Sequence, residues 1–182
     1  MHVMRSSENF VRELAFVAVA DSKIVGCVMF VKGTIAGDDG VVREVLTLGP
    51  IAVLPAYQKK GVGRRLIDHA RKEAIRQGYA AIVLCGDPLY YSRVGFEPAE
   101  NFGIRTADNK YFVALQICPL QEKRPESFAG RYSDDAVYNI SQEAAFEFDQ
   151  QFLPKDRLEN TPSQKRLLEI IEMQRPFDGA KR

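Results

Sequence analysis

Basic residues and glycines cluster in "QKKGVGRR", residues 58–65, directly after an apolar run. Glycines at 61 and 63 let a backbone approach a ligand closely. The helical pattern that follows aims free N–H groups at one point, where the helix dipole is positive, and such a point binds anions, including phosphates. The charged members of the stretch are Lys59, Lys60, Arg64 and Arg65.

Two better-known phosphate motifs do not fit this stretch. A P-loop requires Gly-x4-Gly-Lys-Ser/Thr, and a dinucleotide fingerprint requires Gly-x-Gly-x-x-Gly after a first strand, with an acidic residue further on. Neither pattern occurs here. The local pattern alone therefore leaves two interpretations open, a phosphate cradle or a helix start with a solvated basic face.

The elements before the cluster are predicted to be strands. "LAFVAVADSKIVGCVMFVKGTI" (14–35) predicts two strands joined by a hairpin at Asp21–Lys23, and "VVREVLTLGPIAVLP" (41–55) predicts a third. Gly49-Pro50 interrupts the third strand, because proline cannot donate to a ladder and glycine weakens a strand. We expect a bulge or a splay there.

The elements after the cluster alternate between helix and strand. A helix is predicted from Gly61 to Gly78, then a buried strand at 79–86, a short helix opened by Asp87-Pro88 and closed by Gly95, and a last core strand at 111–120. The order is β-β-β-α-β-α-β. The apolar stripe of the first helix comprises Val62, Leu66, Ile67, Ala70, Ala74 and Ile75.

Composition limits the class of protein. The chain has 182 residues, of which 46% are hydrophobic and 27% charged, enough for a sizeable core. A net charge of +1 argues against a nucleic-acid binder. Cys27, Cys85 and Cys118 form no metal-ligand or disulfide pattern, so we expect reduced core cysteines in a cytoplasmic protein. No run reaches membrane-spanning length, and we expect no membrane association.

Residues 121–182 differ in composition from residues 1–120, which suggests a core followed by a C-terminal extension. A polar stretch precedes two helical patterns at 141–153 and 161–174. Their apolar faces need a partner surface, and we expect either the core or a second copy of the chain, in a homodimer, to cover them. The residues of these faces are Phe146, Phe148, Phe152, Leu167, Leu168 and Ile171.

Two motifs resemble those of the GNAT superfamily of N-acetyltransferases, in particular small bacterial predicted acetyltransferases. "QKKGVG" (58–63) is similar to its Gln/Arg-x-x-Gly-x-Gly/Ala motif, and "YYSRVGFEPA" (90–99) resembles its later Tyr-x-x-x-Gly-Phe element. "LGPIAVLPAY" (48–57) resembles its fourth strand. The resemblance runs from about Phe10 to Leu120. It implies an α/β (α+β) fold with a mixed, mostly antiparallel sheet flanked by helices.

The resemblance also implies acetyl-CoA as the cosubstrate, with no metal. The amides of the 58–63 loop, with Arg64, would hold its pyrophosphate. The splayed strand would pair with the pantetheine arm through the backbone of Ile51 and Val53, and an amide near Ala52 or Val53 would polarise the thioester carbonyl. The implied cofactor-binding residues are Ile51, Ala52, Val53, Gln58, Lys59, Lys60, Gly61, Val62, Gly63 and Arg64.

The implied reaction is direct acetyl transfer to a primary amine in a ternary complex. Tyr91, four residues before Gly95, matches the family tyrosine that protonates the leaving thiolate. The alternative is that Tyr91 is a packing residue. Tyr90 is predicted to be the core neighbour, although a shift of one residue would exchange the two.

A general base is not identified. Glu44 is the nearest carboxylate on the third strand, but relatives that use a glutamate place it near Thr47 of this chain. His69 is predicted to lie on the surface and His2 in a disordered terminus. A water chain to bulk solvent is the default.

The chain departs from the family pattern at its start. The first strand and two helices of the family, which form a wall of the acceptor site in many relatives, have no counterpart before Leu14, and "MRSSENFVRE" resembles only a helix end and its exit loop. Three explanations are open: a chain that starts late relative to its relatives, a natural reduction, or a replacement, for which residues 121–182 are the candidate. Two alternatives to an enzyme stay open, a non-catalytic acyl-CoA-binding or regulatory module and an interaction protein. The acceptor, a small-molecule or peptide amine, is not specified.

Overall fold

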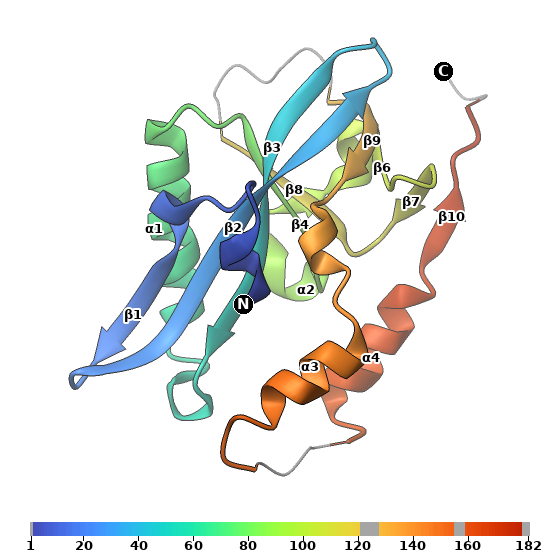
Figure 1. Cartoon of the computed structure of the whole chain (residues 1–182). Helices are drawn as coiled ribbons and strands as arrows, with labels where there is room; N and C mark the ends of the chain where they lie inside the picture. The colour runs from blue at the N-terminus through green and yellow to red at the C-terminus, as the bar shows by residue number, and fades with distance from the viewer. Residues whose placement is uncertain (1, 121–127, 155–158, 180–182) are drawn as a thin grey trace.

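The computed structural model describes residues 2–120, 128–154 and 159–179. Its centre is a mixed sheet with the strand order β5-β8-β4-β3-β2-β9-β6, with β1 also paired to β2 (Figure 1). Most pairs are antiparallel, and β3–β4 and β6–β9 are parallel. The strands are β1 Phe16–Ala20, β2 Lys23–Gly37, β3 Val42–Val53, β4 Ala81–Cys85, β5 Glu97–Pro98, β6 Ile104–Arg105, β8 Leu115–Pro119 and β9 Gly130–Ser133.

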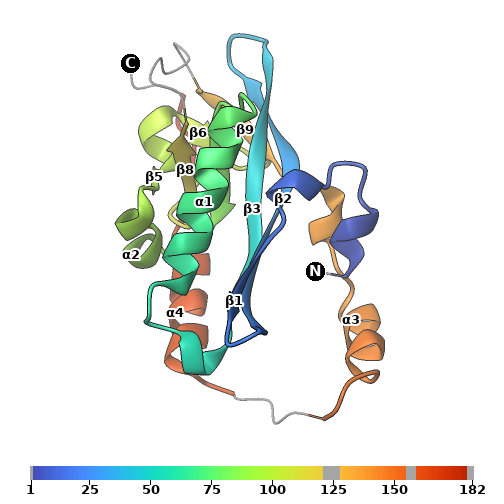
Figure 2. The ribbon, with the colours of Figure 1, turned by 90° about the vertical axis from the view of Figure 1, so that its left-hand side faces the viewer.

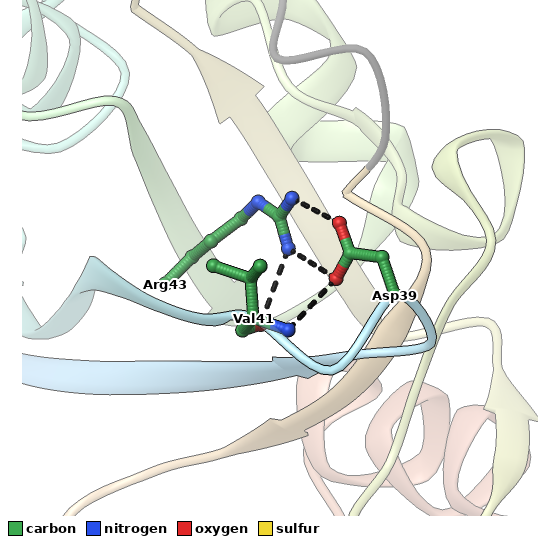
Figure 3. A network of polar contacts seen from close by, with 3 residues as sticks. All are labelled: Asp39, Val41 and Arg43. Carbon is green, nitrogen blue, oxygen red and sulfur yellow. Dashed lines mark hydrogen bonds and ion pairs between the residues drawn. The ribbon is translucent and has the colours of Figure 1, made fainter.

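The first three strands form two successive hairpins, as predicted. Asp21 and Ser22 make the β1–β2 turn with positive φ angles of 50° and 57°. The β2–β3 turn is held by Asp39, whose Oδ1 accepts hydrogen bonds from the Val41 amide and from Arg43 Nη1, each at 3.0 Å (Figure 3). These contacts stabilise the charged carboxylate, with Arg43 contributing most, and they hold its pKa well below the ordinary value.

The interruption at Gly49-Pro50 is a bulge, which confirms the expected irregularity. Val28 pairs with Ile51 and Phe30 pairs with Leu48, so a single residue of β2 faces both Gly49 and Pro50. Beyond this point β3 and β4 diverge. Their parallel ladder consists of Leu46↔Ile82 and Thr47↔Val83, although β3 continues to Val53. The sheet is therefore splayed between these two central strands.

The crossover from β3 to β4 is α1 (Val62–Arg76), which ends before Gly78 at a φ of +82°. Its inner face is buried through Val62, Leu66, Ile67, Ala70 and Ala74. Ile75, predicted to belong to the same stripe, is 50% exposed. The buried face is thus narrower than the sequence suggested.

The helices lie on both sides of the sheet. α1 and α2 (Pro88–Tyr91) are on one side, and the N-terminal turns and α3 (Gln142–Asp149) are on the other (Figure 2). α4 (Pro162–Ile171) overlaps α3 in Figure 1 but lies on the α1 side in Figure 2. α4 begins with a capping box of Thr161 and Gln164. The two helices of the C-terminal extension therefore flank opposite faces.

The predicted last core strand, 111–120, was wrong in two respects. It is broken by a turn at residues 113–114 into β7 (Lys110–Phe112) and β8, and β7 pairs instead with β10 (Gln174–Pro176) in a separate two-stranded sheet. In addition, β9 joins the main sheet beside β2. The main sheet thus includes a strand beyond residue 120. Residues 121–127, which directly follow the suggested division between core and extension, lie outside the described residues.

The segments before β1 and after β9 pack on the sheet. Short 3-10 turns at Val3–Ser6 and Arg12–Leu14 stand where a helix end was expected. Phe128 and Tyr132 lie in one core cluster with strand residues, and Ile170 of α4 is buried. Part of the C-terminal extension therefore covers the core. The other 3-10 turns are Pro55–Tyr57, Ser92–Val94, Ala99–Phe102 and Ala136–Tyr138.

Candidate active site

The glycine segment forms a cradle at the N-terminus of α1. Lys59 and Gly61 have positive φ angles of 58° and 78°, which turn the chain sharply, and the first helical hydrogen bond runs from the Arg65 amide to the Gly61 carbonyl at 3.0 Å. The amides just before Arg65 therefore have no acceptor within the helix. The Gln58 side chain donates to the Val53 carbonyl at 3.0 Å and ties the loop to the end of β3.

A cleft of about 770 Å³ opens in front of this cradle. It runs from the splayed end of β3 to the start of α1, and its other wall is formed by α2 and the turn after it. Nine of the residues predicted from the sequence line it, namely Ile51, Ala52, Val53, Gln58, Lys59, Gly61, Val62, Gly63 and Arg64.

Of the ten predicted cofactor-binding residues, Lys60 is the one that does not line this cleft. Its ammonium lies 5.5 Å from the centre of the Tyr57 ring, and its side chain lines a neighbouring groove between β1 and α1. The cleft also contains residues that the sequence did not indicate. Arg93 and Val94 come from the turn after α2, and Ser163 comes from the first turn of α4.

α4 is held beside the cleft by an ion pair. Arg166 Nε lies 3.5 Å from Asp87 Oδ2, and Asp87 also caps α2 by accepting from the Leu89 amide at 3.0 Å. The sequence predicted a helix over 161–174, but not the side of the sheet on which α4 lies. A tail helix thus contributes to the wall of the cleft.

The two adjacent tyrosines lie in different environments. Tyr90 is 44% exposed and lines the cleft, with its hydroxyl beside Gly63, so its assignment to the core was wrong. Tyr91, the predicted acid, does not line the cleft but packs against the core, with edge contacts to Tyr90 and Phe96. Its ring lies directly over Gly86, the residue that follows β4.

The Tyr91 phenol is held in its neutral form. Burial, and to a smaller extent the neighbouring Tyr90, raise its pKa to about 12. None of the described residues forms a hydrogen bond with its hydroxyl. A neutral phenol near the splayed end of β4 can donate a proton or a hydrogen bond.

A second pocket, of about 310 Å³, opens where β3 and β4 diverge. It includes Thr47–Pro50 of β3 and Cys85 of β4, and residues 132–140 form its far wall. Two hydrogen bonds attach this wall to β3: Thr47 Oγ1 and the Tyr132 hydroxyl are 2.7 Å apart, and the Tyr138 hydroxyl donates to the Gly49 carbonyl at 2.8 Å.

The residues considered from the sequence as a general base lie in different parts of the structure. Glu44 forms an ion pair with Lys32 at 3.1 Å and lines neither pocket. His69 is exposed and contacts Phe16, as predicted for a surface residue. His2 was expected to be disordered, but it stacks on Phe148 with ring centres 4.6 Å apart.

The cysteines differ in environment. Cys118 is buried, as expected, whereas Cys85 was wrongly predicted to be a core residue and faces the second pocket. Although Cys85 is exposed at the pocket, the surrounding protein atoms desolvate its thiol and raise the pKa to about 11, and the nearby Asp134 contributes to the rise. Within residues 2–120, 128–154 and 159–179, no cluster of three or more His, Cys, Asp or Glu residues could hold a metal ion. The same segments contain no helix with the length and apolarity needed to cross a bilayer.

Comparison with known proteins finds a family match over part of the chain. Residues 12–98 match the acetyltransferase (GNAT) domain. The chain is 36% identical over 86 residues to the uncharacterized N-acetyltransferase YjhQ of Escherichia coli K12, which covers 47% of this chain and 46% of that protein. It is 34% identical over 93 residues to the uncharacterized N-acetyltransferase YhbS of the same strain, which covers 50% and 54%. The chain thus spans about half the length of these curated relatives.

Two solved structures share the fold. The GNAT family N-acetyltransferase YhbS from Escherichia coli, in complex with CoA, has a TM-score of 0.67 and 28% identity, covering 76% of this chain and 75% of that one. A GNAT family acetyltransferase from Brucella melitensis, in complex with acetyl-CoA, has a TM-score of 0.51 and 27% identity, covering 68% and 67%.

The splayed mixed sheet and the cradle between β3 and α1 define an α+β fold with a cleft at the splay. Residues 12–98 of this fold match the acetyltransferase (GNAT) domain, and GNAT-family structures that hold CoA or acetyl-CoA share the fold.

Proposed function

We propose that the chain is an N-acetyltransferase that transfers the acetyl group of acetyl-CoA to a primary amine in a ternary complex. The observation that carries this proposal is the continuity of the cradle, the cleft and the splay. One cleft joins the α1 N-terminus to the exposed edge of β3 at Ile51–Val53. This arrangement matches a ligand with a diphosphate at one end and an extended amide-containing arm.

Each part of the cofactor has a proposed partner. The amides at the start of α1, with the exposed Arg64, bind the pyrophosphate through hydrogen bonds and charge. Arg64 lies 3.5 Å from Asp68 and is 66% exposed, so it can turn toward the ligand at little cost. Arg93, across the cleft, adds a second guanidinium. The backbone of Ile51 and Val53 pairs with the pantetheine amides, and an amide at Ala52 or Val53 polarises the thioester carbonyl.

The proposed reaction has three proton transfers. The acceptor ammonium first loses one proton to solvent. The neutral amine then attacks the thioester carbonyl, the C–N bond forms and the C–S bond breaks. The departing sulfur receives a proton from the Tyr91 phenol, which is restored by the proton that the new amide nitrogen loses. The products are the N-acetyl amine and CoA.

Binding and turnover test this proposal separately. Acetyl-CoA at about 100 times its Kd should stabilise the folded protein by about 2.7 kcal/mol, visible as a rise in Tm. CoA release is then followed with a panel of primary amines. No stabilisation by acetyl-CoA would reject a cofactor site, whereas stabilisation without CoA release for any amine would favour a non-catalytic acyl-CoA-binding module.

The assembly proposed with this function is a homodimer through α4. Leu167, Leu168 and Ile171 are 54%, 66% and 43% exposed, a run of apolar surface on one helix. Sedimentation should give twice the chain mass, and Leu168→Glu should shift the protein toward the monomer. A wild-type chain that sediments as a monomer at micromolar concentration would contradict the dimer without affecting the cofactor site.

A further inference from the structure

The second pocket lies next to the cofactor cleft along the same strand. The pocket ends at Pro50 of β3 and the cleft begins at Ile51. The ladder between β3 and β4 stops at Thr47↔Val83, so the two strands leave a gap at this position. A group held at the end of the cleft can therefore be reached from the pocket.

The far wall of the pocket is fixed by residues on either side of Asp134. Tyr132 is hydrogen-bonded to Thr47, and Tyr138 to the Gly49 carbonyl. Asp135 accepts from the Val137 amide at 2.6 Å and from Asn9 Nδ2 at 2.7 Å. The backbone on both sides of Asp134 is thus attached to the sheet and to the N-terminal segment.

Asp134 carries the negative charge of this pocket. Of the described lining residues, it is the one with a carboxylate side chain, whereas the Cys85 thiol and the Tyr132 and Tyr138 phenols stay neutral. Burial raises the pKa of Cys85 to about 11 and raises those of Tyr132 and Tyr138 above the ordinary phenol value. Asp134 also adds to each of these shifts, which indicates that its carboxylate is electrostatically close to all three groups.

Among the described residues, the Asp134 carboxylate forms no hydrogen bond and no ion pair, in contrast to the carboxylate of its neighbour Asp135. The rest of the pocket is largely apolar, with Met4, Leu48, Pro50, Val137 and Ile140 along it. A single carboxylate at the edge of an apolar pocket is complementary to a cation with an apolar body.

We infer that this pocket receives the acceptor and that Asp134 binds it as a small primary ammonium ion with a compact apolar body. The inference rests on the proposed function, since it assigns the second substrate of the same reaction. A volume of about 310 Å³ admits a small molecule or a single side chain. The exposed position of Asp134 also leaves the ammonium a path for its proton to bulk water.

The test uses two isomeric amines of equal size. Benzylamine is a cation at neutral pH, whereas p-toluidine is neutral. Binding to the full chain saturated with CoA is measured by calorimetry, and CoA release from acetyl-CoA gives the KM of each amine that reacts. We expect the wild type to prefer benzylamine, and Asp134→Asn to weaken benzylamine binding by roughly 10–100-fold, the value of a charged hydrogen bond.

Two further variants complete the test. Glu143→Gln removes an exposed carboxylate of α3 and should leave the binding of both amines unchanged. Ile140→Trp fills the pocket from a half-exposed position and should weaken both amines equally, with the charge unchanged. p-Toluidine binding should be insensitive to Asp134→Asn.

The outcomes separate the inference from the proposed function. If acetyl-CoA does not raise the Tm of the wild type, the proposed function fails. If acetyl-CoA does raise it but the isomers bind equally, or Asp134→Asn leaves benzylamine binding unchanged, the acceptor assignment alone is overturned. Unchanged binding of both amines in Ile140→Trp would equally overturn it.

Discussion

Gly61 and Gly63 have different roles in the cradle although only one residue separates them. Gly61 needs its left-handed backbone, at a φ of +78°, but a methyl group there would meet nothing closer than Arg65 Nη1 at 3.7 Å. Gly63 has ordinary helical geometry, and a methyl group there would lie 2.9 Å from the Tyr90 hydroxyl. The first glycine is required by conformation and the second by space at the mouth of the cleft.

Alanine substitutions should separate these two roles. Gly61→Ala is expected to lower the free energy of unfolding by about 1 kcal/mol, the cost of a left-handed non-glycine residue. Gly63→Ala should leave stability nearly unchanged, because the end of the Tyr90 side chain can move, yet raise the Kd for acetyl-CoA by about tenfold. Denaturant titration and calorimetry measure the two quantities. A Gly63→Ala protein with wild-type affinity would contradict the proposed cradle.

Tyr91 and Tyr90 form a matched pair for testing the acid. Tyr91→Phe should lower kcat by about 100-fold, the lower end for acid–base catalysis, with acetyl-CoA affinity retained. Tyr90→Phe should affect cofactor affinity more than kcat, because its hydroxyl lies at the cradle. Since the pKa of Tyr91 is raised to about 12, the phenol stays protonated as the pH rises through 10. A loss of kcat near pH 10 that disappears in Tyr91→Phe would show that the phenol ionises earlier.

At the scale of elements, local patterns predicted most of the core. The β1–β2 hairpin, α1, the caps at Asp87 and Thr161 and the irregularity at Gly49-Pro50 all follow from residues close in sequence. The division of 111–120 did not, because Val113-Ala114 is apolar and carries no turn signal. The pairing partner that decides it, β10, lies far along the chain.

The candidate site was predictable on one side only. The ten predicted cofactor-binding residues lie in two short stretches, 51–53 and 58–64, and nine of them line one cleft, whereas the predicted acid, Tyr91, does not. The second pocket depends on contacts such as Thr47–Tyr132 and Ser7–Asp135, which are 85 and 128 residues apart in sequence. The periodicity of apolar residues along the sequence does not predict contacts at such separations. The exposure of Tyr90 was not predicted, because Tyr90 and Tyr91 lie on a helix of a single turn, which is too short to show an apolar periodicity.

The position of α4 beside the cleft gives an element-scale prediction. Arg166→Ala removes the ion pair with Asp87, so α4 should detach more often and the Ser163 wall should loosen. Amide hydrogen exchange over 162–171 should accelerate, and acetyl-CoA affinity should fall severalfold. Lys165→Ala, one residue away on the same helix, is the control. Faster exchange with unchanged affinity would mean that α4 is not part of the cofactor site.

At the scale of the whole molecule, Asp135 joins the N-terminal segment to a turn more than 120 residues further along the chain. It accepts from Ser7 Oγ at 3.0 Å and from Asn9 as well as from the Val137 amide, so the N-terminal turns and residues 135–138 are held together. Burial opposes ionisation of the carboxyl, but these hydrogen bonds outweigh it, and the pKa of Asp135 lies below its ordinary value of 3.8.

This lowered pKa predicts a loss of stability in acid. The stabilisation is present above the unfolded-state value of 3.8 and is lost as the pH falls through the folded-state pKa. The free energy of unfolding should therefore decrease more steeply below pH 4 in the wild type than in Asp135→Asn. Denaturant titrations at several pH values measure both slopes, and parallel curves would rule out the contribution of Asp135.

The bulge at Gly49-Pro50 leaves part of β3 as a sheet edge in the middle of the molecule. Its two ends are covered by side chains, since Tyr138 donates to the Gly49 carbonyl and Gln58 to the Val53 carbonyl. The stretch between them has no strand beside it on the β4 side among the described residues. Open edges recruit other chains. An extended ligand in the cleft would occupy this edge, so the ligand-free protein should be the form more prone to self-association, and ligand should protect it during heating and storage.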